Sequence, residues 1–197
     1  MNDQVKELLY QMLETELGGV QVYTHALQCV VNPELEEEWT EYLEQTQGHV
    51  EIMRDLFDAL GLDPETQTPG RRVVHHIGES LVQAMQKAKS SGAPPEAAEL
   101  VACECVVLAE TKDHSNWELL SRCAEEAKGA EKKAMKAAVE AVEDQEDEHL
   151  YHSKGWCREL WIQSLGMPAV LPPPEEEKDV KTAIGAARAE KAREEML

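Results

Sequence analysis

Proline and glycine divide this chain into four long stretches that each favour an α-helix. The four stretches cover about residues 3–31, 34–60, 94–127 and 129–165, and a shorter one covers residues 71–90. They are separated by helix-stopping combinations such as Asn32-Pro33 and Leu60-Gly61. Ala, Glu, Leu and Lys are abundant, whereas the β-branched and aromatic residues that favour strands are few. We therefore expect an all-α fold, a four-helix bundle with an extra short helix between the second and third long helices.

The last part of the sequence has a different character. It begins with LPPPEEEKDVK, a proline-rich and acidic spacer, and continues with TAIGAARAEKAREEML, which has good helix formers but few residues to bury. Two interpretations are open: a partly disordered tail, or a terminal helix that docks on a partner subunit or a shell protein. We divide the chain accordingly into a helical bundle, residues 1–168, and a linker with a helical or disordered tail, residues 169–197.

The charge of the chain excludes several kinds of partner. Asp and Glu number 39 against 19 Lys and Arg, so the formal net charge is -20. Such a chain lacks the basic surface that binds nucleic acid, and an anionic membrane surface would repel it. No apolar run approaches the roughly 20 residues that span a bilayer, and the start MNDQVKELLYQM lacks the features of a secretory signal. We expect a cytoplasmic protein that binds neither nucleic acid nor membrane.

The cysteines argue against two further kinds of site. There are five of them, and no two form a C-x-x-C pair. An odd number without this spacing is atypical of a disulfide framework and of a thiolate site for zinc or a rubredoxin-type iron. We expect each cysteine to be a small, largely buried apolar residue.

Each long stretch places Glu or His on the face that carries its apolar residues. In chain order these residues are Glu16, His49, Glu110, His114, Glu146 and His149. The same faces carry no Lys or Arg. An ionised carboxylate in a dry core costs several kcal/mol unless a cation or a metal compensates its charge. The simplest compensation here is a metal ion, or more than one.

The residue types and their spacing support a metal site. Glu and His offer oxygen and nitrogen ligands that suit Fe(II), Mn(II) or Zn(II). Glu146 and His149 are three residues apart, so both lie on one side of a helix and can reach one ion or a close pair. Thr46 and His49 repeat this spacing in the first half of the chain. Such an echo is expected if the chain consists of two similar helical hairpins.

With this pattern, about residues 5–165 resemble the ferritin-like superfamily, notably rubrerythrin and bacterioferritin. Members of that superfamily hold two iron ions between four helices. Their ligands are a Glu on the first and third helices and an E-x-x-H motif on the second and fourth. The ligands that the resemblance implies here are, in helix order, Glu16, His49, Glu110, Glu146 and His149.

The second helix departs from the pattern of the superfamily. Thr46 stands where a bridging Glu is expected. Asp113 and His114 are the spare candidates for a ligand. His114 faces the apolar seam about as well as Asp113 does and is ranked first. It therefore joins the five residues above in the predicted metal site. Three outcomes stay open: a dinuclear site with substituted ligands, a mononuclear site, or an inherited fold without metal.

The other histidines are expected to have lesser roles. His75 and His76 begin the short helix and His25 lies off the first seam, so exposure is expected for all three. His152 follows His149 by one turn and either orients a ligand or is structural.

Three functions follow from such a site. The first is a metal-dependent oxidoreductase of the ferroxidase or peroxidase type, in which two Fe(II) ions reduce O₂ or peroxide. Mn and Zn are the other candidates for the bound metal. Because rubredoxin-type cysteines are missing, its electrons would come from a donor protein. The second is an iron-binding or storage protein without turnover, and the third is a structural or stress-associated protein with a degenerate site. The resemblance also implies a homodimer or a larger homo-oligomer.

Overall fold

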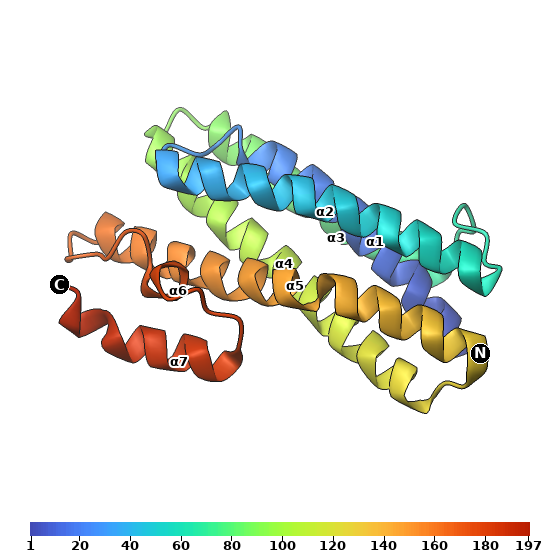
Figure 1. The fold of residues 1–197 in the computed structure, drawn as a ribbon. Coiled ribbons are helices and arrows are strands. Elements are labelled where there is room, and N and C mark those ends of the chain that lie inside the picture. Colours follow the sequence, from blue (N-terminus) through green and yellow to red (C-terminus); the bar gives the residue numbers. More distant parts are fainter.

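Helices form the regular structure of the computed structural model, which describes residues 1–197 apart from the side chain of Glu194. In chain order they are α1 (Asp3–Ala26), α2 (Pro33–Leu60), α3 (Pro69–Lys89), α4 (Pro95–Glu126), α5 (Gly129–Ser164), α6 (Pro174–Glu177), α7 (Ala183–Ala192) and the 3-10 helix η1 (Arg193–Glu195) (Figure 1). The described residues form no strand, which confirms the all-α class. None of the described helices carries an apolar stretch of the length that a bilayer crossing needs.

Local sequence signals set most of the helix ends. Asn32 accepts hydrogen bonds from the first backbone N–H groups of α2. The same helix ends at Gly61, whose φ of 66° lies in the left-handed region that glycine adopts without strain. Helix α1 ends at Ala26, so the prediction of helix up to residue 31 is wrong. Glu99 of α4 accepts hydrogen bonds from the backbone N–H groups of Val31 and Asn32 at 2.7 and 2.6 Å. These N–H groups therefore do not form the hydrogen bonds that would continue α1.

Four helices enclose the interior of the protein. Helix α1 packs against α2 and α4, and α5 packs against α4 and α2, so that the contacts close a ring (Figure 1). Helix α3 lies outside this ring and packs against α1 and α4. The extra helix between α2 and α4 therefore covers one side of the bundle, and its buried Met85 joins one of the apolar clusters.

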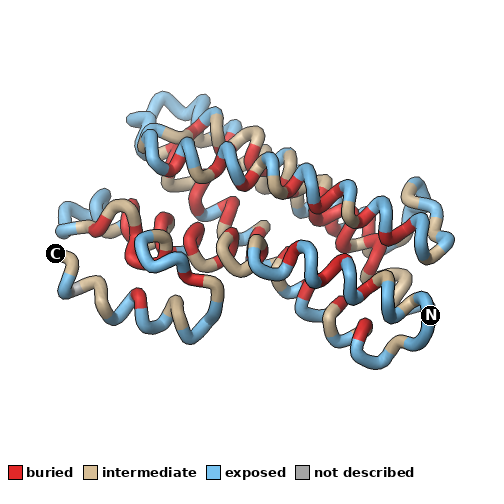
Figure 2. The backbone as a smooth tube through the Cα atoms, viewed as in Figure 1, coloured by how far each residue is buried: buried red, intermediate tan, exposed pale blue. Residues whose placement is uncertain are grey.

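Apolar side chains form two clusters along the bundle. One cluster includes Tyr23, Tyr42, Val106 and Trp156, and the other includes Leu13, Phe57, Trp117 and Val142. On each of the four long helices, the residues of one cluster precede those of the other, and buried polar residues lie between them. Figure 2 shows that the buried positions face the inside of the bundle. The fold thus places a polar layer between two apolar ones.

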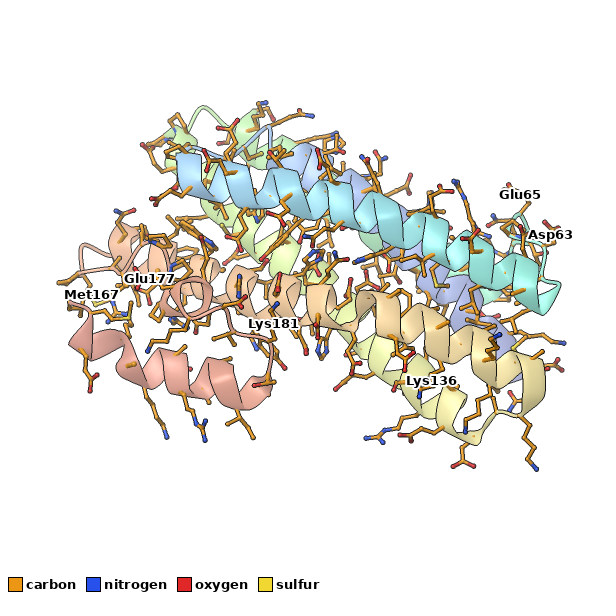
Figure 3. All side chains as sticks on the ribbon, in the orientation of Figure 1. Asp63, Glu65, Lys136, Met167, Glu177 and Lys181 are labelled. Atoms are coloured by element: carbon orange, nitrogen blue, oxygen red, sulfur yellow. The ribbon has the colours of Figure 1, made fainter. Side chains whose placement is uncertain are left out.

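The C-terminal segment packs back onto α5 of its own chain (Figure 1). Arg158 of α5 donates two hydrogen bonds of 2.8 Å to Glu175 of α6. Arg193 donates to both carboxylate oxygens of the buried Glu159, at 2.8 and 2.9 Å. Lys181, labelled in Figure 3, pairs with a carboxylate of α5 at 2.6 Å. In the structure this segment is helical and is held by ion pairs to the bundle.

Candidate metal centre

Five of the six predicted ligand residues lie together in the polar layer of the bundle. Each of the four long helices contributes at least one of them, and all have an exposed fraction of 3% or less. They are Glu16 on α1, His49 on α2, Glu110 on α4, and Glu146 and His149 on α5. The helical seam therefore placed these side chains at one depth, as the sequence predicted.

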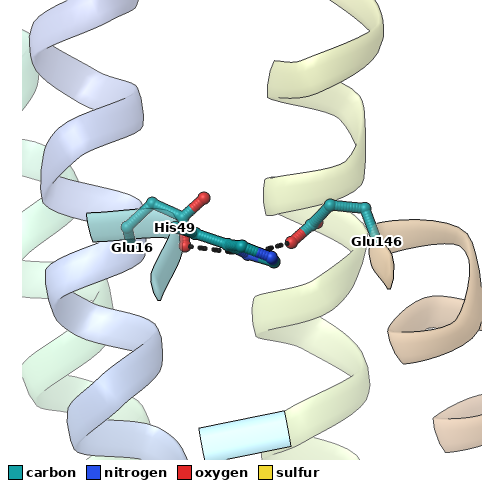
Figure 4. A group of neighbouring side chains, drawn as sticks. All are labelled: Glu16, His49 and Glu146. Atoms are coloured by element: carbon teal, nitrogen blue, oxygen red, sulfur yellow. Dashed lines mark ion pairs between the residues drawn. The ribbon is translucent and has the colours of Figure 1, made fainter. Parts of the chain in front are cut away.

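The first group of possible ligands consists of Glu16, His49 and Glu146. The Nδ1 atom of His49 lies 3.0 Å from Oε1 of Glu146 and 3.7 Å from Oε2 of Glu16 (Figure 4). One potential ligand atom from each of the three residues lies within 4.8 Å of the others. This spacing is close to what three ligands around one metal ion require.

The second group consists of Glu110, Glu146 and His149. The Nδ1 atom of His149 lies 3.7 Å from Oε2 of Glu110 and 3.9 Å from Oε1 of Glu146. This group meets the same limit of 4.8 Å between ligand atoms. Glu146 belongs to both groups, so a single carboxylate is shared between them.

Two glutamines fix the orientation of the two histidines. The Nε2 atom of His49 lies 2.8 Å from Oε1 of Gln145, and Nε2 of His149 lies 2.7 Å from Oε1 of Gln45. A carbonyl oxygen accepts a hydrogen bond, so each Nε2 carries the proton and each Nδ1 is left to face the carboxylates. Our reading of the sequence missed these glutamines. The signal was the Q-x-x-x-H spacing on α2 and α5, which is not specific, because Gln21 and His25 of α1 have it too and lie outside the cluster.

The atoms that face the middle of the cluster lack hydrogen-bond partners among the described residues. They are Glu16 Oε2, His49 Nδ1, Glu110 Oε2, Glu146 Oε2 and His149 Nδ1. Buried polar atoms are nearly always hydrogen-bonded, because each unpaired one costs about 1–3 kcal/mol. All five are carboxylate oxygens or imidazole nitrogens, which are ligand atoms for Fe(II), Mn(II) and Zn(II). The residues present therefore fit a metal centre.

The cluster retains protons when it holds no metal. Burial alone would lower the pKa of His49, but its contacts with Glu146 and Glu16 outweigh burial and raise the pKa to about 11. Burial raises the pKa of Glu146 to about 7, and Glu16 and Glu110 add to the rise, although His49 opposes it. The shift of His49 thus comes from the neighbouring carboxylates, whereas that of Glu146 comes first from burial.

The sixth predicted ligand, His114, lies outside the cluster, so its inclusion is corrected. Its Nε2 lies 2.8 Å from Oδ1 of Asp147, at the protein surface, and its side chain is 14% exposed. Asp113 is the residue that faces the interior, with one carboxylate oxygen buried and unpaired. Burial and then the nearby carboxylates, Glu146 first, raise the pKa of Asp113. The rotation of α4 against α5 decides between these adjacent residues, and the sequence does not show it.

Thr46 contributes no ligand to the centre. Its hydroxyl donates to the backbone carbonyl of Tyr42 at 2.7 Å. Its methyl group lies opposite Gly19 of α1, only 3.1 Å from where a Cβ on that glycine would stand. Thr46 and the close contact between α1 and α2 therefore occupy the space that a longer acidic side chain would need.

The remaining histidines lie outside both ligand groups. His75 and His76 are exposed and His25 is half-buried. His152 is buried, but its Nδ1 lies 3.1 Å from the hydroxyl of Tyr42 and does not contact the ligand atoms. The ring of Tyr42 contacts that of His149, with ring centroids 4.1 Å apart and ring planes tilted by 36°.

A pocket of about 290 Å³ leads from the surface to the cluster. Glu146 and Trp117 line its inner part, and Trp117 donates a 2.8 Å hydrogen bond to Glu16. The lining also includes His114 and three further acidic residues, Glu118, Glu143 and Asp147. The negative lining would attract cations and repel anions.

Comparison with protein-family models, with curated proteins and with solved structures finds no match to this chain. Any statement on its function therefore depends on the geometry and chemistry of the cluster.

Proposed function

We propose that this chain is a ferritin-like protein that binds two iron ions between α1, α2, α4 and α5 and uses them to reduce O₂ or peroxide. The observation that carries the proposal is the pair of buried ligand groups that share Glu146. Single buried ion pairs are common in proteins, but here two adjoining groups of Glu and His share one carboxylate, and several of their inward-facing atoms lack hydrogen-bond partners.

The charges of the buried residues suit two divalent ions. Four carboxylates face this region when Asp113 is counted with the three Glu residues. Fully ionised, they would carry four negative charges, which two divalent cations balance. The histidines then bind as neutral imidazoles through Nδ1, as their glutamine partners require. Mn(II) and Zn(II) fit the same ligands, but Fe(II) adds the redox chemistry.

The protein residues have separate parts in this proposal. Bound iron would supply the electrons that reduce O₂ or peroxide. The pKa of Glu146 is raised to about 7, so near neutral pH part of the metal-free protein carries a proton on this carboxyl and would give it up when a metal binds. The two apolar clusters exclude water from either side of the polar layer. Gln45 and Gln145 keep the imidazole rings turned toward the carboxylates.

The access pocket favours small substrates over organic ones. Its volume of about 290 Å³ and its acidic lining suit Fe²⁺, O₂ and hydrogen peroxide, and oppose anionic metabolites. Ferroxidase or peroxidase chemistry therefore fits better than oxygenation of a large substrate. A donor protein would return electrons in a peroxidase cycle.

A second candidate is an iron-binding protein without turnover. Thr46 favours this alternative, because it provides no ligand and leaves the centre with one shared carboxylate. The ferritin-like superfamily, which the chain resembles, has two. With fewer bridging ligands, the two ions would be less tightly coupled, and metal would be retained without efficient reduction of O₂.

The test is to add Fe(II) anaerobically to the metal-free protein and then supply O₂ or hydrogen peroxide. We expect oxidant consumption well above the uncatalysed rate. Glu146→Gln should abolish the increase, and Asp144→Asn, an exposed change on the same helix, should leave it unaltered. Iron that is bound but oxidised only at the uncatalysed rate would favour the storage alternative. Absence of bound iron would overturn the proposal itself.

A further inference from the structure

A second acidic region lies where α2, α5 and α6 meet, apart from the central cluster. It is a pocket of about 470 Å³. Its lining comprises six carboxylates, one imidazole, one phenol and a proline: Glu34, Glu37, Glu38, Glu41, Glu148, Glu176, His152, Tyr42 and Pro172. No Lys or Arg is among these lining residues. Lys181, outside the lining, pairs with Glu148, and the other five carboxylates have no Lys or Arg among the pocket walls.

The inner end of this pocket contains buried atoms that lack partners. The hydroxyl of Tyr42 donates to Oε1 of Glu38 at 2.6 Å and lies 3.1 Å from Nδ1 of His152. The other oxygen of Glu38 and Nε2 of His152 are buried, and neither has a hydrogen-bond partner among the described residues. The side chains of Glu38 and His152 are only 10% and 8% exposed. These two atoms are available to a ligand.

Helix α6 brings a second carboxyl group to Glu38. Glu176 lines the same pocket as Glu38, and Trp156 of α5 donates a hydrogen bond to it. Burial and then the proximity of Glu38 raise the pKa of Glu176 to about 8. Two carboxylates in one pocket repel each other unless a proton or a cation compensates their charge.

The geometry points to a second divalent-cation site, held by Glu38 of α2 and Glu176 of α6 with His152 beside them. Two carboxylates completed by water are a common set of ligands for Mg²⁺, Ca²⁺ and Mn²⁺. The four outer carboxylates would concentrate cations at the entrance. A bound ion would also join α6 to α2 and so fix the C-terminal segment on the bundle.

This site is distinct from the central cluster and does not depend on the function proposed for it. The two are separated by Tyr42, whose hydroxyl bonds to Glu38 of the outer pocket and whose ring contacts that of His149. Variants can therefore remove one site and leave the other in place.

The experiment uses Mn²⁺ as the probe and the full chain in a Glu146→Gln background, which removes the ligand shared within the centre. Free Mn²⁺ is measured by electron paramagnetic resonance during a titration. We expect one ion per chain, with affinity at least about tenfold weaker after Glu38→Gln/Glu176→Gln. The control Glu34→Gln/Glu37→Gln removes the same charge from the rim and should weaken binding by no more than about threefold. Equal weakening in both pairs would show that only bulk negative charge attracts the ion, and would overturn the site.

A second measurement needs no variant and so avoids any doubt about folding. Hydrogen exchange of the backbone amides of residues 174–180 should slow when Mn²⁺ is added to the unaltered protein. If Mn²⁺ leaves this exchange unchanged, the ion does not join α6 to α2. If Mn²⁺ fails to bind while Glu176→Gln alone raises the melting temperature, the two carboxyl groups share a proton, and the cation site is rejected. Failure of the central site would appear separately, as loss of iron binding with this exchange response intact.

Discussion

The two halves of the central cluster are built alike but are not equivalent. Helices α1 and α2 supply Glu16 and His49, whereas α4 and α5 supply Glu110, Glu146 and His149. The reciprocal bonds between glutamine and histidine relate the two halves almost symmetrically. The symmetry ends at one position, where α5 has Glu146 and α2 has Thr46. The group of Glu16 and His49 is therefore completed by Glu146 from the second half. The predictions below test whether metal binding in the first half depends on this residue.

The largest effect is expected from removal of the shared carboxylate. Glu146→Gln keeps the size of the side chain but removes a ligand from both groups, so the affinity of both ions should fall by on the order of 100-fold or more. Isothermal titration with Fe(II) under argon measures this loss. Asp144→Asn makes a comparable change on the exposed face of α5 and should bind metal normally. Retention of one tightly bound ion by Glu146→Gln would show that the halves bind independently.

The next effect should separate the two halves. Glu16→Gln removes a ligand from the first group only and Glu110→Gln from the second only, so each should reduce metal content from two ions per chain to one. Elemental analysis after desalting gives the count. Because Glu146 serves both groups, the remaining ion should also bind more weakly than in the unaltered protein. Loss of both ions from either variant would mean that occupancy is all-or-none.

A smaller and equal effect is expected from the two orienting glutamines. Gln45→Leu and Gln145→Leu each leave one imidazole without its acceptor, and metal affinity should fall by about 10–100-fold in each case. Gln47→Leu, an exposed change on α2, serves as the control. If only one of the two variants weakens binding, the symmetry seen in the hydrogen bonds does not extend to the metal.

The mildest test is the dependence on pH. The pKa of Glu146 is raised from 4.5 to about 7, so below pH 7 the metal must displace a proton from this carboxyl, and affinity should fall as pH decreases. His49, with a pKa of about 11, should release a further proton on binding throughout the neutral range. Titration calorimetry in buffers of different ionisation enthalpy counts these protons. Binding that is independent of pH between 6 and 8 would contradict the assignment of both residues as ligands.

Much of this arrangement was predictable, because helical periodicity and helix stops are local properties of the sequence. The apolar seams placed Glu16, His49, Glu110, Glu146 and His149 at one depth without knowledge of the tertiary structure. The choice between Asp113 and His114 was not predictable in this way. Adjacent residues differ by about 100° around a helix, and both were compatible with the seam until α5 set the rotation of α4.

The orienting glutamines and the C-terminal segment show a second limit. Gln45 and Gln145 lie beside the seam, where a polar residue ordinarily faces solvent, and the histidine that each one orients lies on the opposing helix. The tail has few apolar residues, so hydrophobic patterning could not show that it docks. It is held instead by ion pairs such as Arg158 with Glu175. The two partners are 17 residues apart in the sequence, so a local pattern does not show that they pair.

The most direct measurement is anomalous diffraction at the iron absorption edge from crystals of the protein loaded anaerobically with Fe(II). The account predicts two peaks in the polar layer, one among Glu16, His49 and Glu146 and one among Glu110, Glu146 and His149, with Glu146 between them. A single peak would establish a mononuclear centre and contradict the dinuclear proposal. No peak in this layer, with iron bound elsewhere or not at all, would contradict the metal centre itself.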